Sequence, residues 1–177
     1  ADQLPHMFAG LMMFGHKLLM PIPDIDRTDH FIVMGGNPLA SNGSIMTAPN
    51  MRQRLKKIKD RGGKVIVIDP RKTETAKVAT SHLGIKPGTD ALFLAAFLNT
   101  IFQEGLVQGG RWQHFSDGFE SVKEAVRPFE PSKVAPICGI DAATIEAMAR
   151  EFAGTKRAVL YGRLGICTQQ FGGLCTW

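Results

Sequence analysis

Two kinds of hydrophobic pattern alternate along the chain. Short, continuous apolar runs rich in β-branched residues predict buried strands of a parallel sheet, at residues 30–34, 64–68, 81–85 and 157–161. Apolar residues at helical spacing predict helices, at residues 6–19, 51–61 (capped by the Asn50 side chain), 90–104, 112–126, 130–136 and 142–153. This alternation predicts an α/β fold, namely a Rossmann-like, three-layer α/β/α arrangement around a mostly parallel sheet. We expect residues 1–29 to form an N-terminal helix and approach segment, and residues 30–177 to form the α/β domain.

Polar and glycine-rich motifs follow the predicted strands. Parallel strands bring their carboxyl ends to one edge of the sheet, where open α/β folds bind ligands. The candidate binding residues at this edge are Gly35, Gly36, Asn37, Asp69, Pro70, Arg71, Gly88, Thr89, Asp90, Gly162, Gly165, Thr168 and Gln169. Acids, a cation, glycines and free backbone N–H groups together predict a ligand with hydroxyls, N–H donors and phosphates, which is the chemistry of a nucleotide.

Each acidic candidate has a definite chemical role and an ordinary alternative. Asp69 can accept two hydrogen bonds from ribose hydroxyls, and Arg71 suits a phosphate. Asp90 can accept both adjacent N–H donors of a guanine ring. The alternatives are that Asp69 caps its own turn and pairs with Arg71, and that Thr89 or Asp90 simply caps a helix. The segment 35–37 has the alternative of a plain β–α turn.

Composition narrows the function classes. A net charge of +5 can help to hold an anionic ligand, but the aromatic residues (8%) do not interleave with the cations, so no nucleic-acid partner is expected. Cys138, Cys167 and Cys175 form no CxxC pair, which predicts free thiols and a cytoplasmic location, with export of the parent protein left open. No apolar run reaches 18 residues, so we expect no membrane span.

The order of the motifs carries more information than any one of them. The chain contains G-G-N-P, then V-I-D-P-R-K-T-E-T-A, then I-K-P-G-T-D-A-L, then Y-G-R-L-G-x-x-T-Q. This succession resembles the molybdopterin oxidoreductases, the group of formate dehydrogenase, nitrate reductase and dimethyl sulfoxide reductase. The resemblance covers residues 30–177 and is most specific at D-P-R-x-T-E-T-A and P-G-T-D.

The resemblance implies a molybdenum or tungsten atom held by two molybdopterin guanine dinucleotides, one of them gripped by a domain similar to this segment. It implies that Gly36 and Asn37 border the cofactor, that Asp69 takes the guanosine ribose beside Arg71, that Asp90 reads the guanine edge, and that Gly165, Thr168 and Gln169 approach the pterin or the phosphates. It further implies a parent enzyme with other domains, an iron–sulfur cluster and an electron-transfer subunit. The segment by itself would be inactive and without cofactor.

The chain departs from the family pattern at two points. The family's G-x-G-x-T-Q is longer here, running from Gly162 to Gln169, and we assign no catalytic residue or metal ligand within residues 1–177. The chain starts at Ala1 instead of a methionine and stops at Trp177, shortly after a Gly-Gly pair, so we expect it to be a piece of a longer polypeptide. The alternative is a free-standing α/β module that binds a nucleotide or a protein without catalysis. A NAD-dependent dehydrogenase is disfavoured because the G-x-G-x-x-G fingerprint is absent.

Overall fold

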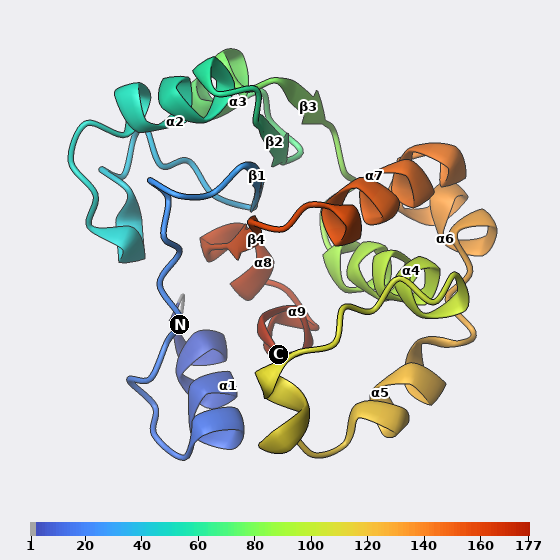
Figure 1. Cartoon of the computed structure of the whole chain (residues 1–177). Coiled ribbons are helices and arrows are strands. Elements are labelled where there is room, and N and C mark those ends of the chain that lie inside the picture. The colour runs from blue at the N-terminus through green and yellow to red at the C-terminus, as the bar shows by residue number, and fades with distance from the viewer. Residues whose placement is uncertain (1–2) are drawn as a thin grey trace.

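The structure is a computed structural model that describes residues 3–177. Figure 1 shows helices arranged around a small sheet. In chain order the elements are α1 (Leu4–Phe14), β1 (His30–Met34), η1 (Ser44–Met46), α2 (Met51–Asp60), β2 (Lys64–Ile68), α3 (Glu74–Val78), β3 (Ser81–Leu83), α4 (Asp90–Gln103), η2 (Arg111–His114), α5 (Phe119–Val126), α6 (Pro131–Cys138), α7 (Ala142–Gly154), β4 (Ala158–Gly162), α8 (Leu164–Cys167) and α9 (Gly172–Thr176).

The four strands form a parallel sheet in the order β3-β2-β1-β4. His30 is in register with Lys64 of β2 and with Ala158 of β4, so the three longest strands begin and end together. Their carboxyl ends, Met34, Ile68 and Gly162, therefore lie side by side at one edge. The prediction of a Rossmann-like α/β fold with a mostly parallel sheet is confirmed.

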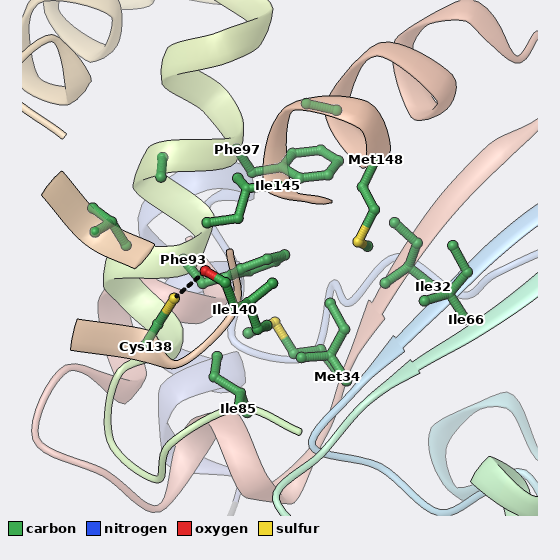
Figure 2. Close-up of a cluster of buried hydrophobic side chains, with 14 of the residues drawn as sticks. Ile32, Met34, Ile66, Ile85, Phe93, Phe97, Cys138, Ile140, Ile145 and Met148 are labelled. Atoms are coloured by element: carbon green, nitrogen blue, oxygen red, sulfur yellow. Dashed lines mark hydrogen bonds between the residues drawn. The ribbon is translucent and has the colours of Figure 1, made fainter. Parts of the chain in front are cut away.

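Alternate side chains of the strands enter two separate cores. On one face, Ile32 and Met34 of β1 belong to a buried cluster with residues of α4, α6 and α7. Figure 2 shows this cluster, in which the sheet residues meet Phe93, Ile145 and Met148. On the other face, Phe31 and Val33 pack with Leu55 and Ile58 of α2. Burial on both faces explains why the strands are continuously apolar.

Three local predictions were wrong, each for an identifiable reason. The first helix ends at Phe14 because Gly15 adopts a left-handed conformation (φ 78°) and its N–H bonds to the Leu11 carbonyl. The helix expected over residues 112–126 is divided into η2 and α5, and Gly118 (φ 83°) lies at the start of the second piece. Asn50 does precede α2, but its amide donates to Gln53 Oε1 instead of capping the helix.

Residues 3–177 contain no helix that is long and apolar enough to cross a membrane.

The core on the α4–α7 side should dominate the stability of the chain. Ile145 is fully buried there, whereas Ile137 of α6 is 49% exposed. We expect Ile145→Ala to lower the free energy of unfolding by about 2–5 kcal/mol, because it leaves a cavity in a packed cluster. The matched control Ile137→Ala should cost no more than about 1 kcal/mol, since surface substitutions have small effects. Urea denaturation monitored by circular dichroism measures both. Equal losses in the two variants would contradict the assigned core.

Candidate functional site

Four segments meet at the carboxyl edge of the sheet. They are the turn after β1, the turn after β2, the start of α4 and the loop after β4. Two hydrogen bonds connect the loop after β4 to the turn after β1 and to the start of α4: Gly165 N donates to Gly35 O over 2.8 Å, and Gln169 Nε2 donates to Asp90 Oδ2 over 2.9 Å. The carboxylates of Asp69 and Asp90 lie near enough to interact electrostatically. The expected convergence of the strand ends is therefore present in the fold.

The turns after β1 and β4 touch backbone to backbone. A Cβ added to Gly165 would lie 2.7 Å from Gly35 Cα, and one added to Gly35 would lie 2.7 Å from Ile166 N. Neither distance leaves room for a side chain. Gly35 also has a positive φ of 60°, which glycine adopts without strain. These two glycines set the spacing of the loops that carry the site.

Asp90 is the most buried acid of the site. It is the first residue of α4, only 5% exposed, and its Oδ2 accepts from Gln169 Nε2. The same Gln169 nitrogen donates to the Gly165 carbonyl over 3.0 Å, while Gln169 Oε1 is buried without a partner. Burial raises the pKa of Asp90, and the charge of Asp69 adds to this, against the opposing hydrogen bond from Gln169. A buried acceptor pair therefore faces this edge.

Asp69 and Arg71 keep some of their polar groups available. Asp69 Oδ1 accepts from the Arg71 backbone N–H over 2.8 Å, which closes the turn around exposed Pro70, while no bond within residues 3–177 engages Asp69 Oδ2. The Asp69 carbonyl lies 2.8 Å from His82 Nε2, which gives that histidine a structural role. Arg71 is 66% exposed and lies 3.8 Å from Glu74. Turn-capping and ligand binding are thus compatible at Asp69.

Asn37 is used mainly to join two elements. Its Nδ2 donates to Glu74 Oε2 over 2.6 Å, and its Oδ1 accepts from the backbone N–H and hydroxyl of Thr75. Both ends of the amide are therefore occupied at the start of α3. The structure gives Asn37 a positioning role, and its contact with a ligand stays a prediction.

The remaining candidates contribute backbone more than side chains. Thr89 precedes α4, but its hydroxyl donates to the Lys86 carbonyl and does not cap the helix. The Thr168 hydroxyl donates to the Leu164 carbonyl. Gly88 has a positive φ of 81° and open space around it, whereas a Cβ at Gly162 would meet the Ile166 side chain at 2.2 Å.

The sequence patterns did not single out two groups near this edge. Arg163, directly after β4, has a buried Nη1 without a hydrogen-bond partner. His6 of α1 lies with its Nδ1 3.0 Å from Cys167 Sγ, because α1 packs against α8 and α9. The Y-G-R-L-G motif contains Arg163, but the sequence does not show that its Nη1 is buried. Within residues 3–177, no group of three or more His, Cys, Asp or Glu side chains is placed to hold a metal ion.

Comparison with known proteins identifies the family of this chain. Residues 6–174 match the family described as molybdopterin oxidoreductase. The chain belongs to this family. Formate dehydrogenase H of Escherichia coli is 34% identical over 155 residues, which is 88% of this chain and 21% of that protein. The F420-dependent formate dehydrogenase subunit alpha of Methanocaldococcus jannaschii is 32% identical over 145 residues, 82% of this chain and 21% of that protein.

A solved structure shares the fold of this molybdopterin oxidoreductase segment. Acetylene hydratase from Pelobacter acetylenicus superposes with a TM-score of 0.82 and 25% sequence identity, over 98% of this chain and 23% of that one. The chain thus spans about a fifth of the length of the proteins it matches. The resemblance inferred from the order of the motifs is confirmed at the level of the family.

The contact between the two glycine turns should be sensitive to a single methyl group. We expect Gly165→Ala to lower the free energy of unfolding by about 1–3 kcal/mol, because the added Cβ overlaps the Gly35 backbone. Gly173→Ala is the control, since a Cβ there meets nothing within 4 Å and alanine favours the helix α9. Thermal and urea denaturation of the two variants test this. A harmless Gly165→Ala would mean that the two turns are farther apart.

The raised pKa of Asp90 gives stability a definite pH dependence. The folded-state pKa lies above the unfolded one, so this contribution is complete below the ordinary carboxyl pKa and is lost as the pH rises through the folded-state value. Asp90→Asn keeps a neutral acceptor for Gln169. We expect the Asp90→Asn chain to have a larger free energy of unfolding than the unsubstituted chain at pH 7. This difference should become smaller as the pH falls and the Asp90 carboxyl group becomes protonated.

Urea denaturation at a series of pH values measures this effect. Asp60→Asn serves as the control, because Asp60 is exposed and paired with Lys56 at 2.8 Å, and it should show no gain at neutral pH. An Asp90→Asn chain that is less stable than the unsubstituted chain at pH 7 would refute the expected sign.

Proposed function

We propose that this segment grips the guanosine end of a molybdopterin guanine dinucleotide in a molybdenum- or tungsten-dependent oxidoreductase. The observation that carries the proposal is the buried pair of Asp90 and Gln169, whose acceptor Gln169 Oε1 has no partner. A buried acceptor without a donor costs free energy, and a ligand N–H would remove that penalty. The acceptors at this edge therefore fit a ligand that brings N–H groups.

A guanine ring matches this requirement. Its Watson–Crick edge offers two adjacent donors, N1–H and N2–H, and a carboxylate accepts both at once. Asp90 supplies that carboxylate, and Gln169 Oε1 supplies a further acceptor beside it. Binding of N–H donors would also favour ionised Asp90, which burial disfavours in the ligand-free chain. The base would thus be read by two side chains that lie 79 residues apart in the sequence.

The ribose and phosphates would lie toward β2. Asp69 Oδ2 is the acceptor that a ribose hydroxyl would use, and Arg71 stands beside it with its guanidinium exposed. Gly88, between β3 and α4, has open space around it, so a ligand can approach the backbone closely there. Each of the two acids of the candidate site thus has one role: Asp90 would bind the base and Asp69 the ribose.

The chemistry itself would belong to the cofactor. When bound, it would supply two-electron redox or oxo transfer at its metal, while this chain binds and orients the dinucleotide. Other parts of a longer protein would bind the second dinucleotide and an iron–sulfur cluster, and a separate subunit would transfer the electrons. The chain spans about a fifth of the length of the relatives it matches. We therefore propose that the segment alone has no activity.

The basic helix α2 gives little support to the alternative function, a free-standing module that binds a protein. Its charges are largely satisfied within the domain: Arg54 pairs with Asp26, Arg61 pairs with Asp29, and the Lys59 ammonium donates to the Val78 carbonyl. A helix whose cations are already paired has few left for an acidic partner.

Replacement of Asp90 should release the nucleotide. In the full-length protein, Asp90→Asn turns one guanine-facing acceptor into a donor, and we expect about tenfold or greater loss of bound guanine dinucleotide, since a hydrogen bond to a charged group contributes about 1.5–3 kcal/mol. Acid release followed by mass spectrometry measures the nucleotide per protein. Asp60→Asn, on the exposed face of α2, should retain the full amount. Unchanged content in Asp90→Asn would remove Asp90 from the site.

A further inference from the structure

Arg163 is a partly buried cation that no carboxylate of residues 3–177 pairs with. It follows β4 directly, and its backbone N–H donates to the Met34 carbonyl over 3.0 Å, which fixes it at the edge of the sheet. Its Nη1 is shielded from solvent and has no hydrogen-bond partner. Arg163 also forms no ion pair with any carboxylate of residues 3–177. Such a group is expensive to bury unless an anion joins it.

Two titratable side chains close to Arg163 carry no negative charge at neutral pH. They are His6 of α1 and Tyr161 of β4, and the charge of Arg163 acts on the pKa of both. Burial, and then the charge of Arg163, lower the pKa of His6, so the imidazole is neutral at pH 7. Burial raises the pKa of Tyr161, so the phenol is neutral as well. Neither of these side chains therefore supplies a counter-charge for Arg163.

The space next to Arg163 is bordered by glycine. A Cβ added to Gly36 would lie 3.1 Å from Arg163 Cβ, so the side chain passes over the Gly36 backbone. Gly35 and Gly165 are in contact immediately beside it, and Gly165 is linked to Gln169 and through it to Asp90. The loop after β4 thus carries both Arg163 and Gln169, and Gln169 holds the carboxylate of Asp90.

We propose that Arg163 binds the diphosphate of the dinucleotide, which rests on the proposed function. A guanidinium presents a planar set of donors that matches phosphate oxygens, and the charge-assisted bonds are stronger when the group is shielded from water. Arg71, the other cation of the edge, is 66% exposed and lies near Glu74, so solvent and a carboxylate screen it. Arg163 is therefore the stronger phosphate ligand of the two.

Two substitutions in the full-length protein test this assignment. We expect Arg163→Met to lower the bound guanine dinucleotide at least tenfold, measured by acid release and mass spectrometry, and Arg163→Lys to restore part of it because it keeps the charge. In the isolated, ligand-free segment, Arg163→Met should unfold at the same or a higher urea concentration, since it removes a charged group whose Nη1 is buried without a hydrogen-bond partner. A structural role for Arg163 would give the opposite stability result.

The controls separate this inference from the proposed function. Arg52→Met, on the exposed face of α2, should leave the nucleotide content unchanged. If the unsubstituted protein carries the dinucleotide and Asp90→Asn loses it while Arg163→Met retains it, the role of Arg163 is refuted and the guanine pocket stands. If Arg163→Met loses both stability and nucleotide and Arg163→Lys restores neither, the diphosphate assignment is also overturned. A full-length protein without any guanine dinucleotide would instead refute the proposed function.

Discussion

The backbone contact between Gly35 and Gly165 is the constraint on which the site depends. It joins the turns that follow the neighbouring strands β1 and β4, and it does so without side chains in between. Because Gly165 is held there, its carbonyl can receive Gln169, and Gln169 in turn holds the carboxylate of Asp90. The parallel register of β1 with β4 makes the contact possible, since both strands end at the same level. The site is therefore a direct consequence of strand register and two glycines.

Most of the fold could be predicted because its strands are buried on both faces. Continuous apolar runs mark β1 and β2 to the residue, and turn residues end them. The errors fall where helical periodicity continues past a glycine: Gly15 stops α1 although apolar residues follow it, and Gly118 separates η2 from α5. The predicted helix caps by Asn50 and Thr89 do not form. The Asn50 amide donates to Gln53 instead, and the Thr89 hydroxyl donates to the Lys86 carbonyl. The local sequence pattern thus predicts the type of each element more accurately than the residue at which the element ends.

The site could be predicted as a place but not as a set of contacts. Parallel topology alone brings Asp69 and Asp90 to one edge, whatever their partners are. The pairing of Asp90 with Gln169 spans 79 residues of sequence, and the engagement of Asn37 by Glu74 and Thr75 depends on how the β1 turn meets α3. The burial of Arg163 depends on packing around the end of β4. None of these follows from residue type or spacing, since each is decided by the meeting of two distant segments.

The two unsatisfied groups at the edge are of opposite kinds, and this limits what can satisfy them together. Gln169 Oε1 needs a donor, and Arg163 Nη1 needs an acceptor with negative charge. A water molecule can donate to the first and accept from the second, but it brings no charge to offset a buried guanidinium. A free phosphate would neutralise Arg163 and would offer Gln169 no ring N–H. A nucleotide with a base that donates and a diphosphate that accepts meets both requirements in one molecule, which is why the pair of unsatisfied groups argues for a dinucleotide more strongly than either does alone.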